Sequence, residues 1–109
     1  MGLRDELLGA QPEVKEVTIK GAVYRLRKPT VAERSKVYEL AGLDGADAKS
    51  VKVNLGRLQT AALIAMLVDE KGAAVFSDAD FDALLGCPVG SATDKLGSAA
   101  AGLLNEGEG

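Results

Sequence analysis

The hydrophobic and polar positions alternate with a period of two near the N-terminus, in two short runs on either side of a glycine. This period is typical of β-strands that bury one face. If Lys20 and Gly21 form a two-residue turn, Val17 faces Tyr24 and the alternating apolar residues of both runs lie on one side. The pattern therefore predicts a β-hairpin over residues 14–27.

A helix is predicted directly after the hairpin, over residues 30–41. Pro29 ends the second strand and favours an extended conformation at the residue before it. Thr30 and Glu33 have the spacing of a capping box, in which each side chain accepts a hydrogen bond from the backbone N–H of the other residue. Gly42 is expected to end this helix.

The longest apolar segment lies in the middle of the chain, and its helical period predicts a second helix over residues 51–69. The first half of this segment has a single apolar stripe, but its second half is apolar on nearly every side. A helix of this kind is buried on several sides. Because a chain of 109 residues has few other elements to cover it, part of this helix is expected to contact another subunit.

Two further helices are predicted in the C-terminal part, over residues 78–85 and 91–105. Three aspartates stand at the start of the first, where negative charge complements the helix dipole, and Ser77 is expected to be its N-cap. Residues 1–12 are expected to be either a short helix or a flexible terminus. The predicted fold class is α+β, mainly α: one domain over residues 1–109, with an N-terminal β-hairpin followed by three to four helices.

Composition and charge exclude several classes of partner. The net charge is −3, the isoelectric point is about 4.9, and no basic recognition helix is visible. Such a chain is a poor ligand for nucleic acid or for an acidic membrane surface. Its longest apolar run is too short to span a bilayer, and its N-terminus lacks the pattern of a signal peptide. We therefore expect no nucleic acid and no membrane as partners, and a cytoplasmic location.

No arrangement of side chains predicts catalysis. Histidine, the commonest general base and metal ligand, is absent from the chain. The acidic run Asp78, Asp80 and Asp82 does not fit a calcium-binding loop, since a loop starting at Asp78 would place Ala83 where a glycine is required. Cys87 has no histidine to activate it. We therefore predict no catalytic residue, no metal, no cofactor and no enzymatic activity.

A basic cluster follows the hairpin turn and consists of Arg25, Arg27, Lys28 and Arg34. Phosphate binding is one interpretation of such a cluster. It lacks interleaved aromatic residues, however, and has glutamates nearby, and in the predicted hairpin Glu16 faces Arg25. It is therefore interpreted as a solvated face.

Three stretches, in their order and spacing, resemble a known protein family. They are the hairpin VTIKGAVYRLRKPT, the helix start TVAERSKVYEL, and the apolar helix with its acidic turn, AALIAMLVDEKGAAVFSDADFDALLG. A terminal helix rich in alanine and leucine follows. On these stretches the chain resembles the tail assembly chaperones of long-tailed bacteriophages and prophages.

This resemblance implies a non-enzymatic protein that binds the tape measure protein and keeps it soluble during tail morphogenesis. It also implies contact with the tail tube protein through a longer, frameshifted form, a homo-oligomer, and a place in the cytoplasm of the bacterial host but not in the mature virion. The alternative is a small structural tail-completion or minor tail protein. The residues expected to contact a partner are apolar residues of the two longest helices: Leu55, Leu58, Ala62, Leu63, Met66, Leu67, Leu96 and Leu103.

Overall fold

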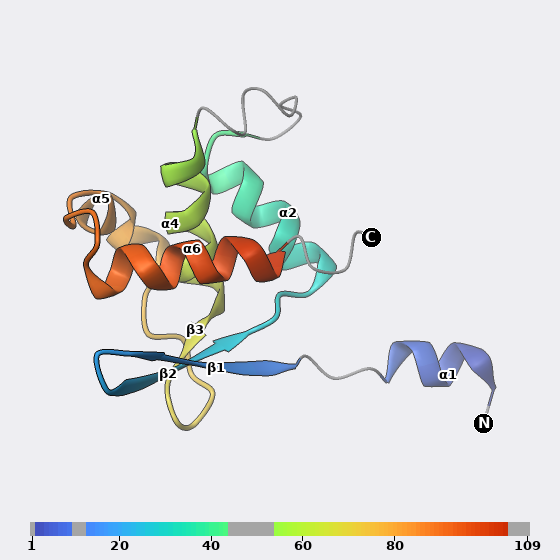
Figure 1. The fold of residues 1–109 in the computed structure, drawn as a ribbon. Coiled ribbons are helices and arrows are strands. Elements are labelled where there is room, and N and C mark those ends of the chain that lie inside the picture. Colours follow the sequence, from blue (N-terminus) through green and yellow to red (C-terminus); the bar gives the residue numbers. More distant parts are fainter. Residues whose placement is uncertain (1, 10–12, 44–53, 105–109) are drawn as a thin grey trace.

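The computed structural model describes residues 2–9, 13–43 and 54–104. A β-hairpin near the N-terminus is followed by several helices, as predicted, so the fold class is α+β, mainly α (Figure 1). The elements in chain order are α1 (Leu3–Leu8), β1 (Val14–Ile19), β2 (Ala22–Arg27), α2 (Val31–Leu40), α4 (Leu55–Met66), β3 (Leu67–Val68), the 3₁₀ turn η1 (Asp78–Asp80), α5 (Phe81–Leu85) and α6 (Ala92–Leu104).

The hairpin has the predicted register. Val17 lies opposite Tyr24 in the antiparallel pair of β1 and β2. Lys20 and Gly21 form the turn with φ angles of 51° and 82°, and two successive positive φ angles are what a tight hairpin turn of the primed type requires. The face predicted to be apolar packs on the core, where Leu26 is fully buried.

The central helix is shorter at its C-terminal end than the sequence predicts. Instead of continuing to residue 69, α4 ends at Met66, and Leu67 and Val68 form the short strand β3. β3 pairs antiparallel with β2, with Leu67 opposite Leu26, and the sheet has the order β1-β2-β3. Over so few apolar residues, periodicity does not separate a buried helix from a buried strand. Here the free edge of β2 offers backbone hydrogen-bonding partners to Leu67 and Val68, and these partners favour the strand. The predicted residues 51–53 of this helix lie outside the described part.

α2 begins with the predicted capping box. Thr30 Oγ1 accepts a hydrogen bond from the backbone N–H of Glu33 at 3.1 Å, and Glu33 Oε1 accepts one from the backbone N–H of Thr30 at 2.9 Å. At the other end of α2, Arg57 Nε of α4 donates to the Ala41 carbonyl at 2.9 Å. The Arg57 guanidinium also lies 5.0 Å from the centre of the Phe81 ring. One side chain of α4 therefore connects α2 with α5.

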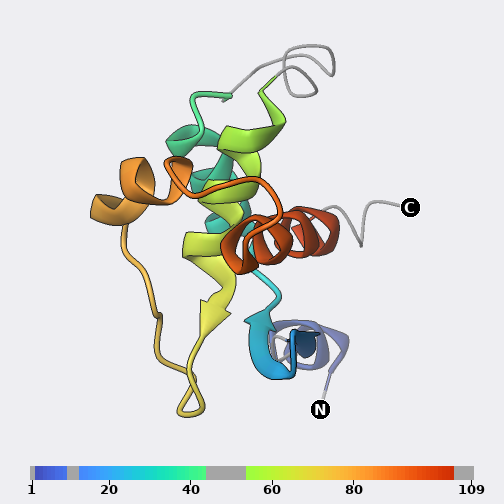
Figure 2. The ribbon, with the colours of Figure 1, turned by 60° about the vertical axis from the view of Figure 1, so that its left-hand side comes forward.

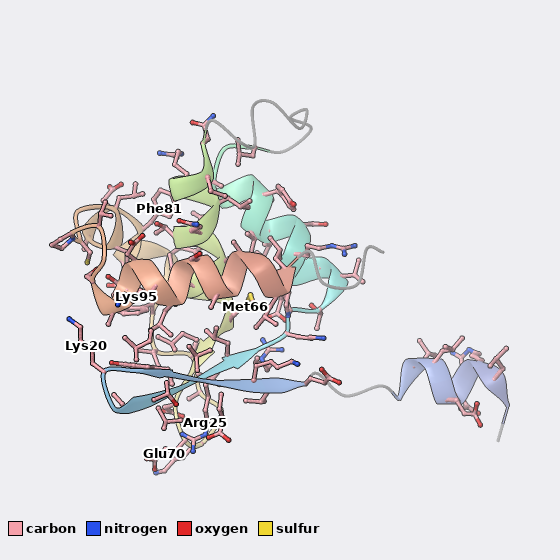
Figure 3. The ribbon with its side chains drawn as sticks, viewed as in Figure 1. Lys20, Arg25, Met66, Glu70, Phe81 and Lys95 are labelled. Atoms are coloured by element: carbon pink, nitrogen blue, oxygen red, sulfur yellow. The ribbon has the colours of Figure 1, made fainter. Side chains whose placement is uncertain are left out.

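α4 is the centre of the core and contacts α2, α5, α6 and β2. Two views show α6 crossing α4 (Figures 1 and 2), and the fully buried Met66 lies between α6 and the sheet (Figure 3). At the crossing, a Cβ atom on Gly97 of α6 would lie 3.2 Å from the carbonyl oxygen of Gln59 and 3.3 Å from its Cβ. A glycine at this position therefore lets the two helices approach closely.

The acidic segment starts a helix, as predicted, but its first turn is the 3₁₀ turn η1 and α5 follows it. The extended residue before η1 is Ser77, whose backbone N–H donates to the Asp80 carboxylate at 2.9 Å. Asp80 thus satisfies a backbone donor that the start of the helix would otherwise leave unpaired. The last predicted helix is present as α6, and its predicted final residue, 105, lies outside the described part.

Within the N-terminal segment 1–12, residues Leu3–Leu8 form the short helix α1, which was one of the two possibilities, and residues 1 and 10–12 lie outside the described part. α1 lies beyond the start of β1, apart from the body formed by the sheet and the other helices (Figure 1), and none of its side chains is buried.

Candidate protein-binding surface

Six of the eight residues predicted to contact a partner lie inside the domain. The six are Leu58, Ala62, Leu63, Met66, Leu67 and Leu96, each at most 5% exposed. Because α2, α5, α6 and the sheet surround α4, the chain itself covers most of the apolar surface for which a second subunit was expected. Only a small part of each of these six side chains is therefore exposed to a partner in this structure. Leu55 is 44% exposed and Leu103 is partly buried, so partner contact stays a prediction for these two.

An apolar groove runs between α2 and α4, with the segment after β3 along one side. Its floor is formed by Val37 and Leu40 of α2, Ile64 and Ala65 of α4, and Phe76. We call it the α2–α4 groove, and its volume is about 390 Å³. Side chains on packed helices form ridges and grooves, and the ridges of another helix can pack into such grooves.

Charged residues of both signs stand on the rim of the α2–α4 groove. Lys36 and Asp78 are exposed there, and Arg27 forms an ion pair with Glu33. Partial burial alone would raise the pKa of Glu33, but hydrogen bonds from Arg27 and from the backbone of Thr30 outweigh it. The pKa of Glu33 therefore lies below its ordinary value of 4.5, and the pair is ionised at neutral pH. An apolar floor between charged rims matches the surface of an amphipathic helix.

A second hollow lies at the edge of β2 that the short strand β3 leaves open. Within β2, the residues that pair with β3 are Arg25 and Leu26. β3 therefore does not extend along the part of β2 nearer the hairpin turn. The hollow has a volume of about 580 Å³, and we call it the hairpin cleft. Its apolar lining comes from β2, β3, the following segment and α6: Val23, Tyr24, Leu67, Val68, Val75, Phe76, Ala92 and Leu96.

The rim of the hairpin cleft is charged. It includes Arg25 of β2 and, on the turn after β3, Asp69, Glu70 and Lys71. The carboxylate of Asp69 accepts hydrogen bonds from the backbone N–H groups of Lys71 and Ala73 at 2.8 and 3.0 Å, which shape this turn. Figure 3 shows Arg25 and Glu70 on the side of the hairpin away from the helices. The cleft thus combines an apolar interior with exposed charges of both signs.

Three of the four basic residues after the hairpin turn pair with glutamates. The pairs are Arg25 with Glu16 at 4.0 Å, Arg27 with Glu33, and Lys28 with Glu13 at 3.1 Å. A hydrogen bond from Lys28 and its positive charge lower the pKa of Glu13. These pairings agree with the interpretation of the cluster as a solvated face. The two pairs that involve the exposed Glu16 and Glu13 contribute little to stability.

The described residues show no group prepared for chemistry. Within residues 2–9, 13–43 and 54–104, no polar or charged residue is buried and no three potential ligands gather for a metal ion. Cys87 is half-buried in the loop before α6, with Sγ 3.7 Å from the Ala83 carbonyl oxygen. None of the described helices combines the length and the apolar character needed to cross a membrane. What this surface offers is two apolar hollows with charged rims, an arrangement suited to binding another protein.

Neither hollow is predictable from the sequence, because each forms between segments that are distant in the chain. Val68 and Phe76 line both of them. One signal is present in the sequence: the run Ala-Ala-Val-Phe at residues 73–76 is apolar but belongs to no predicted helix. Such residues can contribute to a contiguous exposed apolar patch, and large patches of this kind mark interaction sites.

No protein-family model and no curated protein sequence matches this chain. Among solved structures, it is similar to one described as the structure of the bacteriophage HK97 tail assembly chaperone, at 18% sequence identity and a TM-score of 0.60. The match covers 94% of this chain and 97% of the other, so it concerns the whole arrangement of elements. The fold implied by the resemblance of the three sequence stretches is confirmed: the chain has the fold of the bacteriophage HK97 tail assembly chaperone.

Proposed function

We propose that this protein is a phage tail assembly chaperone that binds the tape measure protein and keeps it soluble, without enzymatic activity. The observation that carries the proposal is the similarity to the HK97 tail assembly chaperone over nearly the full length of both chains. The order of the three sequence stretches supports it independently, because it rests on residue types and their spacing and not on the course of the backbone. The absence of histidine and the two apolar hollows agree with a binding role.

The α2–α4 groove is the place where we expect a helical client to bind. A client helix with apolar residues three and four apart would set them on the floor formed by Ile64, Ala65 and Phe76. Its polar residues would meet Lys36 and Asp78 on the rim. A groove of about 390 Å³ contacts only a short segment, so several copies would bind along a long client, each with modest affinity.

The proposal extends to partners and location. A longer form with a C-terminal extension would bring the tail tube protein to the coated tape measure protein, and the chaperone would act in the host cytoplasm and leave before the virion is complete. A structural tail protein is the alternative outcome. Detection of this chain in purified, mature particles, at a fixed ratio to the tube protein, would decide for that alternative.

Co-expression with the cognate tape measure protein tests the proposal. The wild-type chain should raise the soluble fraction of that protein and co-purify with it. Ala65→Glu places a charge on the groove floor and should abolish this effect. Lys36→Glu changes only the exposed rim and should weaken it without altering the fold.

The matched controls are Val89→Glu, at a side chain that is 95% exposed and outside the groove, and Lys95→Glu, an exposed lysine on α6. Both should keep the client soluble. Circular dichroism checks that each variant is folded. If the wild-type chain leaves the tape measure protein insoluble, the proposed function is wrong. If the wild-type chain keeps the tape measure protein soluble and the groove variants do so equally well, the groove is not the binding site.

A further inference from the structure

The N-terminal helix α1 presents three leucines to solvent. Leu3, Leu7 and Leu8 are 71%, 69% and 70% exposed. Leu3 and Leu7 are four residues apart and Leu8 is adjacent, so all three lie on one side of the helix. A helix of six residues is not stable alone in water, because nucleation is unfavourable and few hydrogen bonds follow it. α1 therefore needs a surface on which to pack.

The body of the protein offers a matching surface in the hairpin cleft. Two of its lining residues, Val23 and Val75, are themselves 51% and 49% exposed, so the cleft has apolar surface that nothing in the described chain covers. The α2–α4 groove differs in this respect, since none of its large apolar residues is exposed to that degree. The apolar side of α1 and the hairpin cleft are thus two exposed apolar surfaces that can cover each other.

The charges of the two surfaces are also complementary. On α1, Arg4 lies within the leucine side, while Asp5 and Glu6 flank it. The rim of the cleft carries Glu70, whose charge is opposite to that of Arg4, and basic residues, among them Lys71, whose charge is opposite to that of the acidic flanks. Opposite charges around an apolar contact fix the register of two surfaces more than they add affinity.

The positions of α1 and the cleft indicate whether α1 docks in the cleft of its own chain or in that of another copy. α1 leaves the body at Val14, at one end of the hairpin, whereas the cleft begins at Val23 near the turn at the other end (Figure 1). The chain from Leu8 to Val14 can span at most about 20 Å. Doubling back from Val14 to the level of Val23 takes about 13 Å along the strand, and more is needed to pass from β1 to the far edge of β2. For α1 to dock in the cleft of its own chain, the connection between Leu8 and Val14 would have to reverse direction and be almost fully extended.

We propose that α1 of one copy docks its leucine side into the hairpin cleft of a second copy. Because α1 and the cleft lie toward opposite ends of the hairpin, the contact is head-to-tail, and each copy can both provide an α1 helix and receive one. In this arrangement, copies of this chain associate through α1. This inference goes beyond client binding and concerns a different hollow, which shares only Val68 and Phe76 with the α2–α4 groove. Its tests change other residues, so each proposal can fail without the other.

Directed cross-linking tests the proposal on the full chain. In a Cys87→Ser background, a chain with Leu7→Cys is mixed with a chain carrying Val75→Cys, and mild oxidation should give a covalent heterodimer. Val31→Cys, at a residue that is 74% exposed and outside the cleft, is the control and should cross-link much less. Equal cross-linking to Val31→Cys, or none to Val75→Cys, would overturn the proposal. So would a double variant, Leu7→Cys with Val75→Cys, that closes only within its own chain at high dilution.

Measurement of the mass in solution provides the second test. By light scattering at increasing concentration, the wild-type chain should be larger than a monomer. Replacing Leu3, Leu7 and Leu8 together with serine should return it to a monomer with an unchanged circular dichroism spectrum, because none of the three is buried. Val89→Ser is the control and should still assemble. A wild-type monomer at every concentration, or assembly that persists in the triple variant, would contradict the proposal.

Discussion

The crossing of α4 and α6 allows the packing of one glycine to be measured against a matched control. A Cβ atom at Gly97 would lie 3.2 Å from the carbonyl oxygen of Gln59, whereas one at Gly102, on the same helix, would have no atom within 4 Å. Glycine is less favourable than alanine in a helix interior by about 1 kcal/mol. Gly102→Ala should therefore stabilise the protein by about 0.5–1 kcal/mol.

Gly97→Ala has the same gain in helix propensity, but it also inserts a methyl group into a tightly packed contact, which costs about 1–3 kcal/mol. The atoms nearest to the new methyl group belong to the backbone and Cβ of Gln59, and these atoms cannot rotate away as the end of a long side chain could. The two effects leave Gly97→Ala neutral to destabilising by about 2 kcal/mol. The two alanine variants should therefore differ by about 1–3 kcal/mol.

Urea unfolding of the three proteins, followed by circular dichroism, measures this difference, provided that the slope of the transition is the same in all of them. Gly56→Ala on α4, which also meets no atom within 4 Å, is a second control and should behave like Gly102→Ala. If Gly97→Ala is as stabilising as these controls, the helices do not approach as closely as described and the reasoning is wrong.

Three other predictions follow from the core and the helix ends. Leu63→Asp should unfold the domain, because Leu63 is 1% exposed and a buried carboxylate without a partner is very unfavourable; a variant that keeps the wild-type circular dichroism spectrum would place this residue at the surface. Glu33→Ala, which loses the capping box of α2, should lower the free energy of unfolding by about 0.5–2 kcal/mol, whereas Glu33→Gln, which keeps the capping acceptor, should lose less. Because the pKa of Glu33 is lowered from 4.5, its contribution is present above pH 4.5 and is lost as the pH falls through the lower, folded-state value; acid titration of Glu33→Gln should lack this component. Asp80→Ala should destabilise the protein by about 0.5–2 kcal/mol, since Asp80 accepts from the Ser77 backbone, and unchanged denaturant melts would mean that another residue caps this helix.

Local patterns in the sequence are enough to predict the elements that depend on neighbours in the chain. The hairpin register follows from alternation and a two-residue turn, and Val17 does lie opposite Tyr24. The capping box of Thr30 and Glu33 follows from a spacing of three residues, and both of its hydrogen bonds are present. In each case the interacting groups are close in sequence, so the physical reason is visible without the fold.

Features that depend on distant segments are not predictable in this way. Leu67 and Val68 continue an apolar helix by pattern, yet they form β3 because the edge of β2 lies beside them in the fold. The same limitation affects the expected binding residues. The sequence pattern predicts that apolar residues such as Leu63 and Leu96 form surface that the chain itself does not cover. In the structure, α6 packs across α4 and both residues are buried. Which apolar residues stay exposed depends on helix crossings, and a single sequence does not specify these.

We propose that the α2–α4 groove holds an apolar helix of the tape measure protein. Backbone amide chemical shifts of the ¹⁵N-labelled protein, measured during titration with helical segments of that protein, test it most directly, because they locate the contact residue by residue. We predict shifts concentrated at Leu40, Ile64 and Ala65, which line the groove and not the hairpin cleft, with no change at Val89, which lines neither. Shifts that instead cluster away from the groove, or no shifts with any segment, would contradict the claim.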